Sequence, residues 1–352
     1  MTDSGPEPID WDLALATARR LAPAGPEVPA DEAREAVAML RDLAREAIAP
    51  VRDVTGMTAP DTSAAVVVDR SAWISSNLAS MRGLLGSWDT LSERTESAPQ
   101  VVRALGSRGT ALQLGAVLAW LSTKVLGQFE ALATGSRDEP GRLLLVAPTI
   151  VQVEHQLKVD PHDFRLWVCL HEEAHRVQFG AVPWLRTHFT QRITALLDAS
   201  SLSARETAER LIAFAYALVR SVRSDDVDVL SALQTPEQRV IVDELTGLMS
   251  LLEGHADVVM DDVGPAIVPS VGQIRERFTA RRQHPGAIDQ VVRRALGVDA
   301  KMRQYSDGAS FVRHVVERAG MAGLNEVWVS PDRLPSRREI HAPDEWMARV
   351  LG

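Results

Sequence analysis

Cysteine is almost absent from this 352-residue chain, which contains only Cys169. A single cysteine excludes an intramolecular disulfide and a zinc module built from several cysteines. On a helix, Cys169 and His171 would point in different directions, because residues two apart do not share a face. We therefore interpret Cys169 as a small apolar core residue rather than a ligand.

Lysine is also scarce, and basic charge does not dominate anywhere. Of the 38 basic residues, only Lys124, Lys158 and Lys301 are lysines, which we attribute to genomic base composition. The 47 acidic residues give a net charge of −9, and no basic tract offsets it. This charge balance argues against a nucleic-acid partner.

Long apolar runs are missing as well. The longest uncharged stretch in the middle of the chain, residues 109–123, contains Gly, Gln, Ser and Thr. It is too short and too polar to span a membrane. The first residues, MTDSGPEPIDWD, are acidic and polar, unlike a secretory signal. We expect a cytoplasmic protein without a membrane partner.

The functional argument rests on the motif H-E-x-x-H at residues 171–175. Residues four apart lie on the same face of a helix, so His171 and His175 can present two imidazoles to one metal ion. Glu172 follows the first histidine, where its carboxylate can take a proton from a water molecule at the metal. Glu173 points elsewhere and is given no chemical role.

Residues 161–179 have the features of a helix that carries this motif. Asp160 and Pro161 are typical of an N-cap followed by the first helical position, and Asp163 places an acid in the first turn. The apolar flanks of the motif favour a buried helix over a solvated helix with two unrelated histidines. Gly180 is expected to end the helix.

A catalytic zinc site needs a third protein ligand and leaves the fourth position for water. The best candidates lie in a helix predicted over residues 236–262, in the stretch LLEGHAD. Glu253 and Asp257 are four residues apart and can both face the site. One carboxylate can bind the metal while the other accepts a proton from the back of a ligand histidine. Gly254 permits close approach to the helix of the motif.

His255 is the alternative third ligand. It lies about 200° around the helix from Glu253, so the two residues cannot easily bind the same ion. We favour Glu253 because a nearby pair of carboxylates explains more of the pattern. The alternative stays open, since imidazole is an equally good ligand for zinc.

Helical periodicity dominates the chain, and we predict a mainly α fold with a few short strands. The strands are expected at residues 64–68 and 142–147, which are β-branched or apolar. Residues 1–30 are interpreted as a poorly ordered or loosely packed segment and residues 31–352 as one mostly helical domain. The other expected helices are 31–48 (ended by Pro50), a helix that ends at 85, 99–106, 109–132, 182–197, 204–222, one that ends at 282, and three or four short ones in 287–351.

Several stretches together resemble the bacterial family known as zincin-like metallopeptidase type 2. They are LGQFE (126–130), HEEAHRVQF (171–179), EGHADVVMDDVGPAIVPSV (253–271), IRERFTARR (274–282) and DAKMRQYSDGASFV (299–312). The resemblance implies a mostly helical protein with a zincin-like core. Members are often described as associated with biosynthesis of the deazaflavin coenzyme, but the chain has no G-x-G-x-x-G motif and no P-loop.

These observations predict a zinc-dependent hydrolase, most simply a metallopeptidase that acts on a peptide or protein. His171, His175 and Glu253 would hold Zn²⁺, and Glu172 would act as the base. The oxyanion formed in the reaction needs a further donor, for which Tyr305 and His255 are candidates. The alternative is a zincin-fold protein that binds metal or a partner and catalyses nothing. A helical regulator without metal would require the histidine pair to be coincidental.

Overall fold

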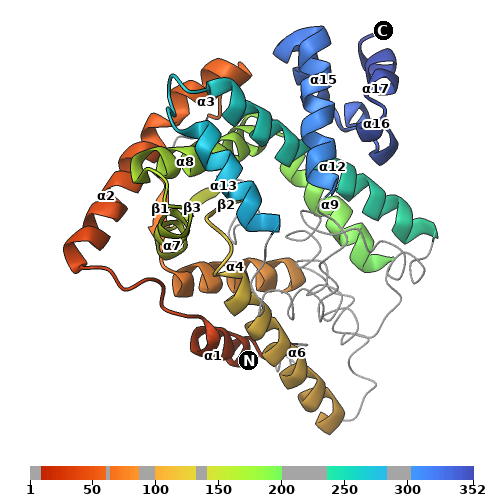
Figure 1. Cartoon of the computed structure of the whole chain (residues 1–352). Helices are drawn as coiled ribbons and strands as arrows, with labels where there is room; N and C mark the ends of the chain where they lie inside the picture. The colour runs from red at the N-terminus through yellow and green to blue at the C-terminus, as the bar shows by residue number, and fades with distance from the viewer. Residues whose placement is uncertain (1–8, 61–63, 87–99, 132–140, 200–235, 284–302) are drawn as a thin grey trace.

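The computed structural model describes residues 9–60, 64–86, 100–131, 141–199, 236–283 and 303–352, without the side chains of 100–105 and 303–306. These parts are mainly helical with three short strands, which confirms the expected fold class (Figure 1). None of the described helices is long and apolar enough to cross a membrane. The elements are α1 (Trp11–Leu21), α2 (Ala30–Glu46), α3 (Ile48–Thr55), β1 (Val66–Val68), α4 (Arg70–Gly86), α6 (Gln100–Leu121), β2 (Gly127–Glu130), β3 (Arg142–Val146), α7 (Ala147–Leu157), α8 (Pro161–Ala181), α9 (Leu185–Asp198), α12 (Pro236–Val263), α13 (Val271–Gln283), α15 (Arg303–Asn325), η2 (Glu326–Trp328), η3 (Pro331–Arg333), α16 (Arg337–His341) and α17 (Pro343–Val350).

The three strands form one small mixed sheet in the order β1-β3-β2. The central strand β3 runs parallel to β1 and antiparallel to β2, with Gly127 opposite Leu145. Leu143, Leu144, Leu145 and Val146 are all buried, as expected for a strand that is covered on both faces. Helix α8 contacts β2 and β3, and α4 contacts β1 and β3 (Figure 1).

Side chains on β2 alternate between these two covering helices, as the period of a strand requires. Phe129 stacks on Phe179 of α8 with the ring centroids 6.0 Å apart. On the opposite face, the Oε1 atom of Gln128 accepts a hydrogen bond of 2.8 Å from Nε1 of Trp73 in α4. Strand β2 is therefore held between the two helices.

The sequence prediction missed β2 and extended a helix through it. The two helices expected at 99–106 and 109–132 are one helix, α6, which ends at Leu121. An isolated glycine such as Gly109 costs a helix only about 1 kcal/mol, so it does not break α6. The helix ends where the hydroxyls of Ser122 and Thr123 donate to the carbonyls of Ala119 and Trp120.

Pro50 does not end a helix, contrary to expectation. Helix α2 stops at Glu46, and α3 starts at Ile48, so Pro50 lies in the first turn of α3. The N–H groups of a first turn have no acceptor inside the helix, and proline is tolerated there because it lacks that group. Gly56, with φ of 65°, ends α3 in the left-handed region.

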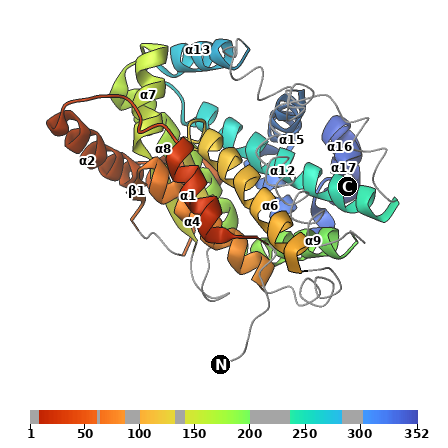
Figure 2. The same ribbon diagram turned by 90° about the horizontal axis from the view of Figure 1, so that it is seen from below.

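The N-terminal helix α1 is packed more tightly than the prediction for residues 1–30 allowed. Ala14 and Ala18 are fully buried, and α1 lies along α6 (Figure 2). A Cβ atom on Gly115 of α6 would lie 2.7 Å from the carbonyl oxygen of Ala14, so the two helices meet at short range. Residues 9–21 therefore belong to the packed body of the molecule.

Helices α12 and α15 cross at two glycines. A Cβ atom on Gly254 would lie 2.2 Å from the carbonyl carbon of Gly308, and one on Gly308 would lie 2.0 Å from the oxygen of Ser250. The close approach expected at Gly254 is therefore made to α15. Helix α15 is also longer than the short helices expected in this part, with a kink at Gly320 (φ 71°).

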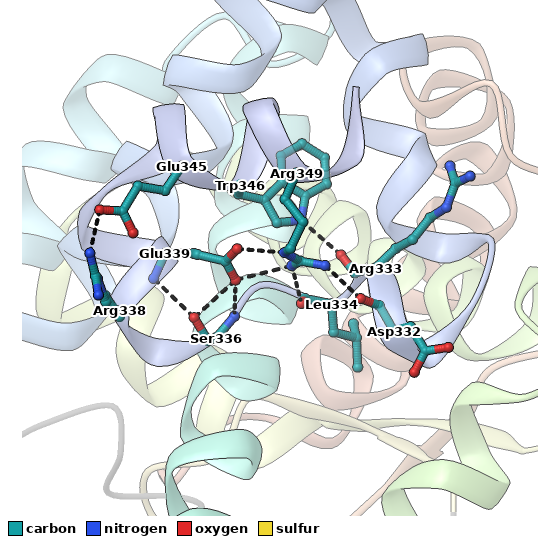
Figure 3. A network of polar contacts seen from close by, with 9 residues as sticks. All are labelled: Asp332, Arg333, Leu334, Ser336, Arg338, Glu339, Glu345, Trp346 and Arg349. Atoms are coloured by element: carbon teal, nitrogen blue, oxygen red, sulfur yellow. Dashed lines mark hydrogen bonds and ion pairs between the residues drawn. The ribbon is translucent and has the colours of Figure 1, made fainter. Parts of the chain in front are cut away.

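The C-terminal elements are joined by a network of charged and polar side chains (Figure 3). Ser336 and Glu339 form a capping box at the start of α16. Arg349 of α17 donates to both carboxylate oxygens of Glu339, at 2.7 and 3.0 Å, and to the carbonyl oxygens of Asp332 and Leu334. We refer to Ser336, Glu339 and Arg349 as the C-terminal network.

Candidate metal centre

Helix α8 begins as the sequence predicts. The Oδ1 atom of Asp160 accepts a hydrogen bond of 3.0 Å from the backbone N–H of Asp163, and Pro161 is the first helical residue. The helix continues one residue past the expected stop at Gly180. His171 and His175 therefore project from the same face of α8, toward α12.

Three ligand atoms converge between α8 and α12. The Nε2 atoms of His171 and His175 are 3.2 Å apart, and each is 3.7 Å from a carboxylate oxygen of Glu253. With metal–ligand bonds of 2.0–2.1 Å, ligand atoms around tetrahedral zinc are about 3.3 Å apart. The spacing of these donors is therefore suitable for one zinc ion. We refer to His171, His175 and Glu253 as the ligand group.

The partners of the two rings indicate which nitrogen carries the proton. Nδ1 of His175 is 2.9 Å from Oε1 of Gln178, and Nδ1 of His171 is 3.2 Å from the sulfur of Met260. Both partners can accept a hydrogen bond, so in a neutral ring each Nδ1 carries the hydrogen and each Nε2 has the lone pair. In that form, two lone pairs and a carboxylate face one another, an arrangement that a metal ion or a proton on one of the rings would stabilise.

Glu172 is buried beside the ligand group. Glu172 is 5% exposed. A Cβ atom added to Gly127 of β2 would lie 2.5 Å from Cγ and 2.8 Å from Oε1 of Glu172. A side chain at this position of β2 would overlap with the carboxylate of Glu172 as it is placed here. Burial, and then the negative charge of Glu253, raise the pKa of Glu172 well above its ordinary value.

Glu173, the next residue, has a different environment. Nε of Arg176 donates a hydrogen bond of 2.7 Å to its carboxylate, and both side chains are buried. Burial raises the pKa of Glu173, while the charge and hydrogen bonds of Arg176 act in the opposite direction. Its partner is thus an arginine of the same helix rather than the ligand group.

The sequence profile of the zincin-like metallopeptidase family matches residues 9–347. The chain belongs to this family. A crystal structure of a candidate hydrolase with a novel fold from Chloroflexus aurantiacus is also similar, with 30% identity and a TM-score of 0.68. The match covers 97% of this chain and 98% of that one. No curated protein matches the chain.

Family membership confirms the resemblance inferred from the sequence and, together with this structural neighbour, indicates a hydrolase. A zincin-like protein is expected to bind a metal, and His171, His175 and Glu253 form a group of suitable donors. Two imidazoles and one carboxylate are a donor set that zinc accepts. The assignment of these three residues as ligands stays a prediction.

Two other candidates of this zincin-like chain, His255 and Asp257, lie outside the ligand group. His255 is fully buried, with its Nδ1 3.0 Å from Nε2 of Gln178. Burial, and then the charge of His175, lower the pKa of His255 to about 4. The carboxylate of Asp257 lies 3.8 Å from the guanidinium of Arg275 on α13. Tyr305 is in the first turn of α15, but its side chain lies outside the described residues.

Sequence reasoning missed three residues at this zincin-like site. Gln178 and Met260 contact the backs of the ligand histidines, a role that the prediction considered for Asp257. Gln178 is three residues after His175, and this helical spacing was a signal available in the sequence. Gly127 had no such signal, because its closeness to Glu172 depends on how β2 packs against α8.

Proposed function

We propose that this chain is a zinc-dependent metallopeptidase in which the ligand group holds the metal and Glu172 is the general base. The observation that carries the proposal is the convergence of three acceptors, the Nε2 atoms of His171 and His175 and the carboxylate of Glu253. A cation would stabilise such a group, and the donor set suits zinc. A bound zinc ion would supply Lewis acidity, which activates water and polarises a carbonyl group.

Glu172 is the proton-transfer residue of this proposal. Its position directly after His171 puts its carboxylate next to the ligand group, and Gly127 leaves room for it from the other side. A buried base of raised pKa can take a proton from the attacking water and release it to the leaving amine. Because Glu172 is enclosed, the proton is transferred away from bulk water.

A peptide substrate is supported by the position of β2. In the described part of the chain, the sheet order places β2 at an edge, and Gly127 of this strand contacts Glu172. An extended peptide can add to such an edge through main-chain hydrogen bonds. That addition would bring a peptide bond alongside the proposed base.

Tyr305 is the proposed oxyanion donor. Its backbone lies one helical turn before Gly308, where α15 touches α12 next to Glu253. A hydroxyl group that reaches the reacting carbonyl would stabilise the charge that develops on its oxygen. His255, the other candidate, is buried behind His175 and contacts Gln178.

The experiment that tests this proposal measures metal content and peptide hydrolysis on the purified chain. We expect about one zinc per chain in the wild type, loss of zinc in Glu253→Ala, and retained zinc without hydrolysis in Glu172→Gln. Zinc bound without any hydrolysis of a peptide library in the wild type would favour the catalytically silent alternative. A wild type that binds no zinc after reconstitution would contradict the metal site itself.

A further inference from the structure

Gln178 is a fully buried amide that links the two helices of the ligand group. Its Oε1 lies 2.9 Å from Nδ1 of His175 on α8. Its Nε2 donates a hydrogen bond of 2.8 Å to the carbonyl oxygen of Leu252 on α12 and lies 3.0 Å from Nδ1 of His255. Both hydrogens and the oxygen of the amide are therefore used.

The carbonyl of Leu252 fixes the orientation of this amide. A backbone carbonyl can only accept, so the atom that faces it has to be the NH₂ group of Gln178. A flipped amide would place two oxygens against each other in a buried site, which is unfavourable. The Oε1 atom consequently faces His175 and can only accept from its ring.

We propose that Gln178 is a positioning residue that holds His175 in the Nδ1–H tautomer and so keeps its Nε2 lone pair directed at the metal. The inference rests on the proposed function, since it concerns the same metal site. A ligand histidine that can change tautomer spends part of its time with a proton on Nε2, and that state cannot bind a metal.

His255 is the second hydrogen-bond partner of the NH₂ group of Gln178. Its Nδ1 faces an NH₂ group and therefore accepts, which places the hydrogen of the neutral ring on Nε2. The ring packs edge-on against Trp328 with centroids 5.5 Å apart, and the carbonyl oxygen of Trp328 accepts a hydrogen bond from Trp184. His255 thus supplies an acceptor for Gln178 rather than a ligand for the metal.

The link also reaches the third ligand. Leu252, whose carbonyl anchors Gln178, is the residue directly before Glu253. One side chain therefore sets the tautomer of His175 and ties its helix to the backbone that presents the carboxylate. Loss of Gln178 is expected to affect both the second and the third member of the ligand group.

The first test needs no metal, and a variant is used only to assign one signal. The full chain is labelled with ¹⁵N-histidine, and long-range ¹H–¹⁵N spectra report the tautomer of each imidazole, with His175 assigned from the spectrum of His175→Gln. We expect His175 to be in the Nδ1–H form in metal-free wild type. A His175 ring in the Nε2–H form, which predominates in free histidine, would overturn the proposal even if the chain binds zinc.

The second test compares two buried glutamines. In Gln178→Met, we expect His175 to lose its single tautomer and zinc affinity to fall roughly 10- to 100-fold, measured by competition with a chelator dye. Gln238→Met is the matched control, because Gln238 is also buried and donates to a backbone carbonyl, that of Ala199, away from the metal site. Equal zinc affinities for the two variants would contradict the proposal.

The two tests separate this inference from the proposed function. A wild type that binds no zinc but shows the Nδ1–H form of His175 would contradict the metallopeptidase and leave the role of Gln178 supported by the tautomer alone. Normal zinc binding with an unchanged tautomer in Gln178→Met would contradict only the positioning role.

Discussion

The ligand group and the C-terminal network differ in the partners that surround their carboxylates. In the C-terminal network, the carboxylate of Glu339 meets the guanidinium of Arg349 and the N–H and hydroxyl of Ser336 (Figure 3). In the ligand group, the carboxylate of Glu253 meets two imidazole nitrogens that carry lone pairs. The first arrangement pairs opposite charges, whereas the second brings together three groups that can each bind a metal ion. Such a local departure from charge complementarity is a mark of function.

The largest expected effect comes from adding zinc, which we propose binds to the ligand group. Free zinc at 1,000 times its dissociation constant should raise the free energy of unfolding of the wild type by about 4 kcal/mol. Calorimetry with zinc and with a chelator measures this increment. His175→Ala should abolish it, while Arg349→Met should keep it, because Arg349 lies outside the ligand group. An unchanged melting temperature of the wild type on zinc addition would contradict the comparison.

The second prediction separates two adjacent glutamates. Glu173→Gln removes the carboxylate that faces the buried guanidinium of Arg176, and breaking a buried ion pair costs about 3 kcal/mol or more. Chemical denaturation should show this loss while zinc content stays at the wild-type value. Glu172→Gln is the control, since the neighbouring charge that affects Glu172 is another carboxylate, that of Glu253. A similar destabilisation in both variants would remove the distinction between them.

The third prediction concerns the C-terminal network. Arg349→Met removes the donor shared by Glu339 and two backbone carbonyls, which should lower the free energy of unfolding by about 2 kcal/mol without changing zinc affinity. Urea denaturation of the metal-free chain measures it.

The same network predicts a dependence on pH. Burial raises the pKa of Glu339, but the hydrogen bonds from Arg349 and Ser336 outweigh this and leave it below the ordinary 4.5. A lowered pKa in the folded state adds stability above the unfolded pKa, and that stability is lost as the pH falls through the folded value. The difference between wild type and Arg349→Met should therefore shrink on acidification below about pH 4. A difference that grows on acidification would contradict this sign.

The smallest expected effect is an increase in the free energy of unfolding on mutation, whereas the variants above lower it. In metal-free protein, Glu253→Gln removes a negative charge that faces Glu172, so the free energy of unfolding should rise by up to about 1 kcal/mol. The matched change in the C-terminal network, Glu339→Gln, should lower it. Denaturation in the presence of a chelator compares the two, and a loss of stability in both would show that Glu253 is held as an ordinary structural carboxylate.

Local signals in the sequence predicted the start and the course of α8. Asp160 and Pro161 act on their immediate neighbours, so the cap requires no knowledge of the rest of the fold. The strand β2 lacks such a signal, because Gly127 and Gln128 have little strand propensity of their own. It forms because β3 pairs with it, and that partner lies more than ten residues further along the chain.

The third member of the ligand group, like β2, could not be predicted from local signals in the sequence. From the sequence, Glu253 and His255 were both open as ligands, because each can be placed toward a neighbouring helix. The packing of α12 against α8 puts the carboxylate of Glu253 near both imidazoles and leaves His255 behind Gln178. The rotation of α12 about its own axis decides whether Glu253 or His255 faces the two histidines. The periodicity of the sequence does not predict this rotation to within one residue.

The glycine crossing of α12 and α15 also decides which parts of the molecule can move. At Gly254 and Gly308 the two backbones touch without a side chain between them, so one helix cannot slide along the other without a collision. Glu253 is next to this contact, so the backbone that presents its carboxylate is held against α15. A movement of α12 relative to α8 would therefore have to carry α15 with it.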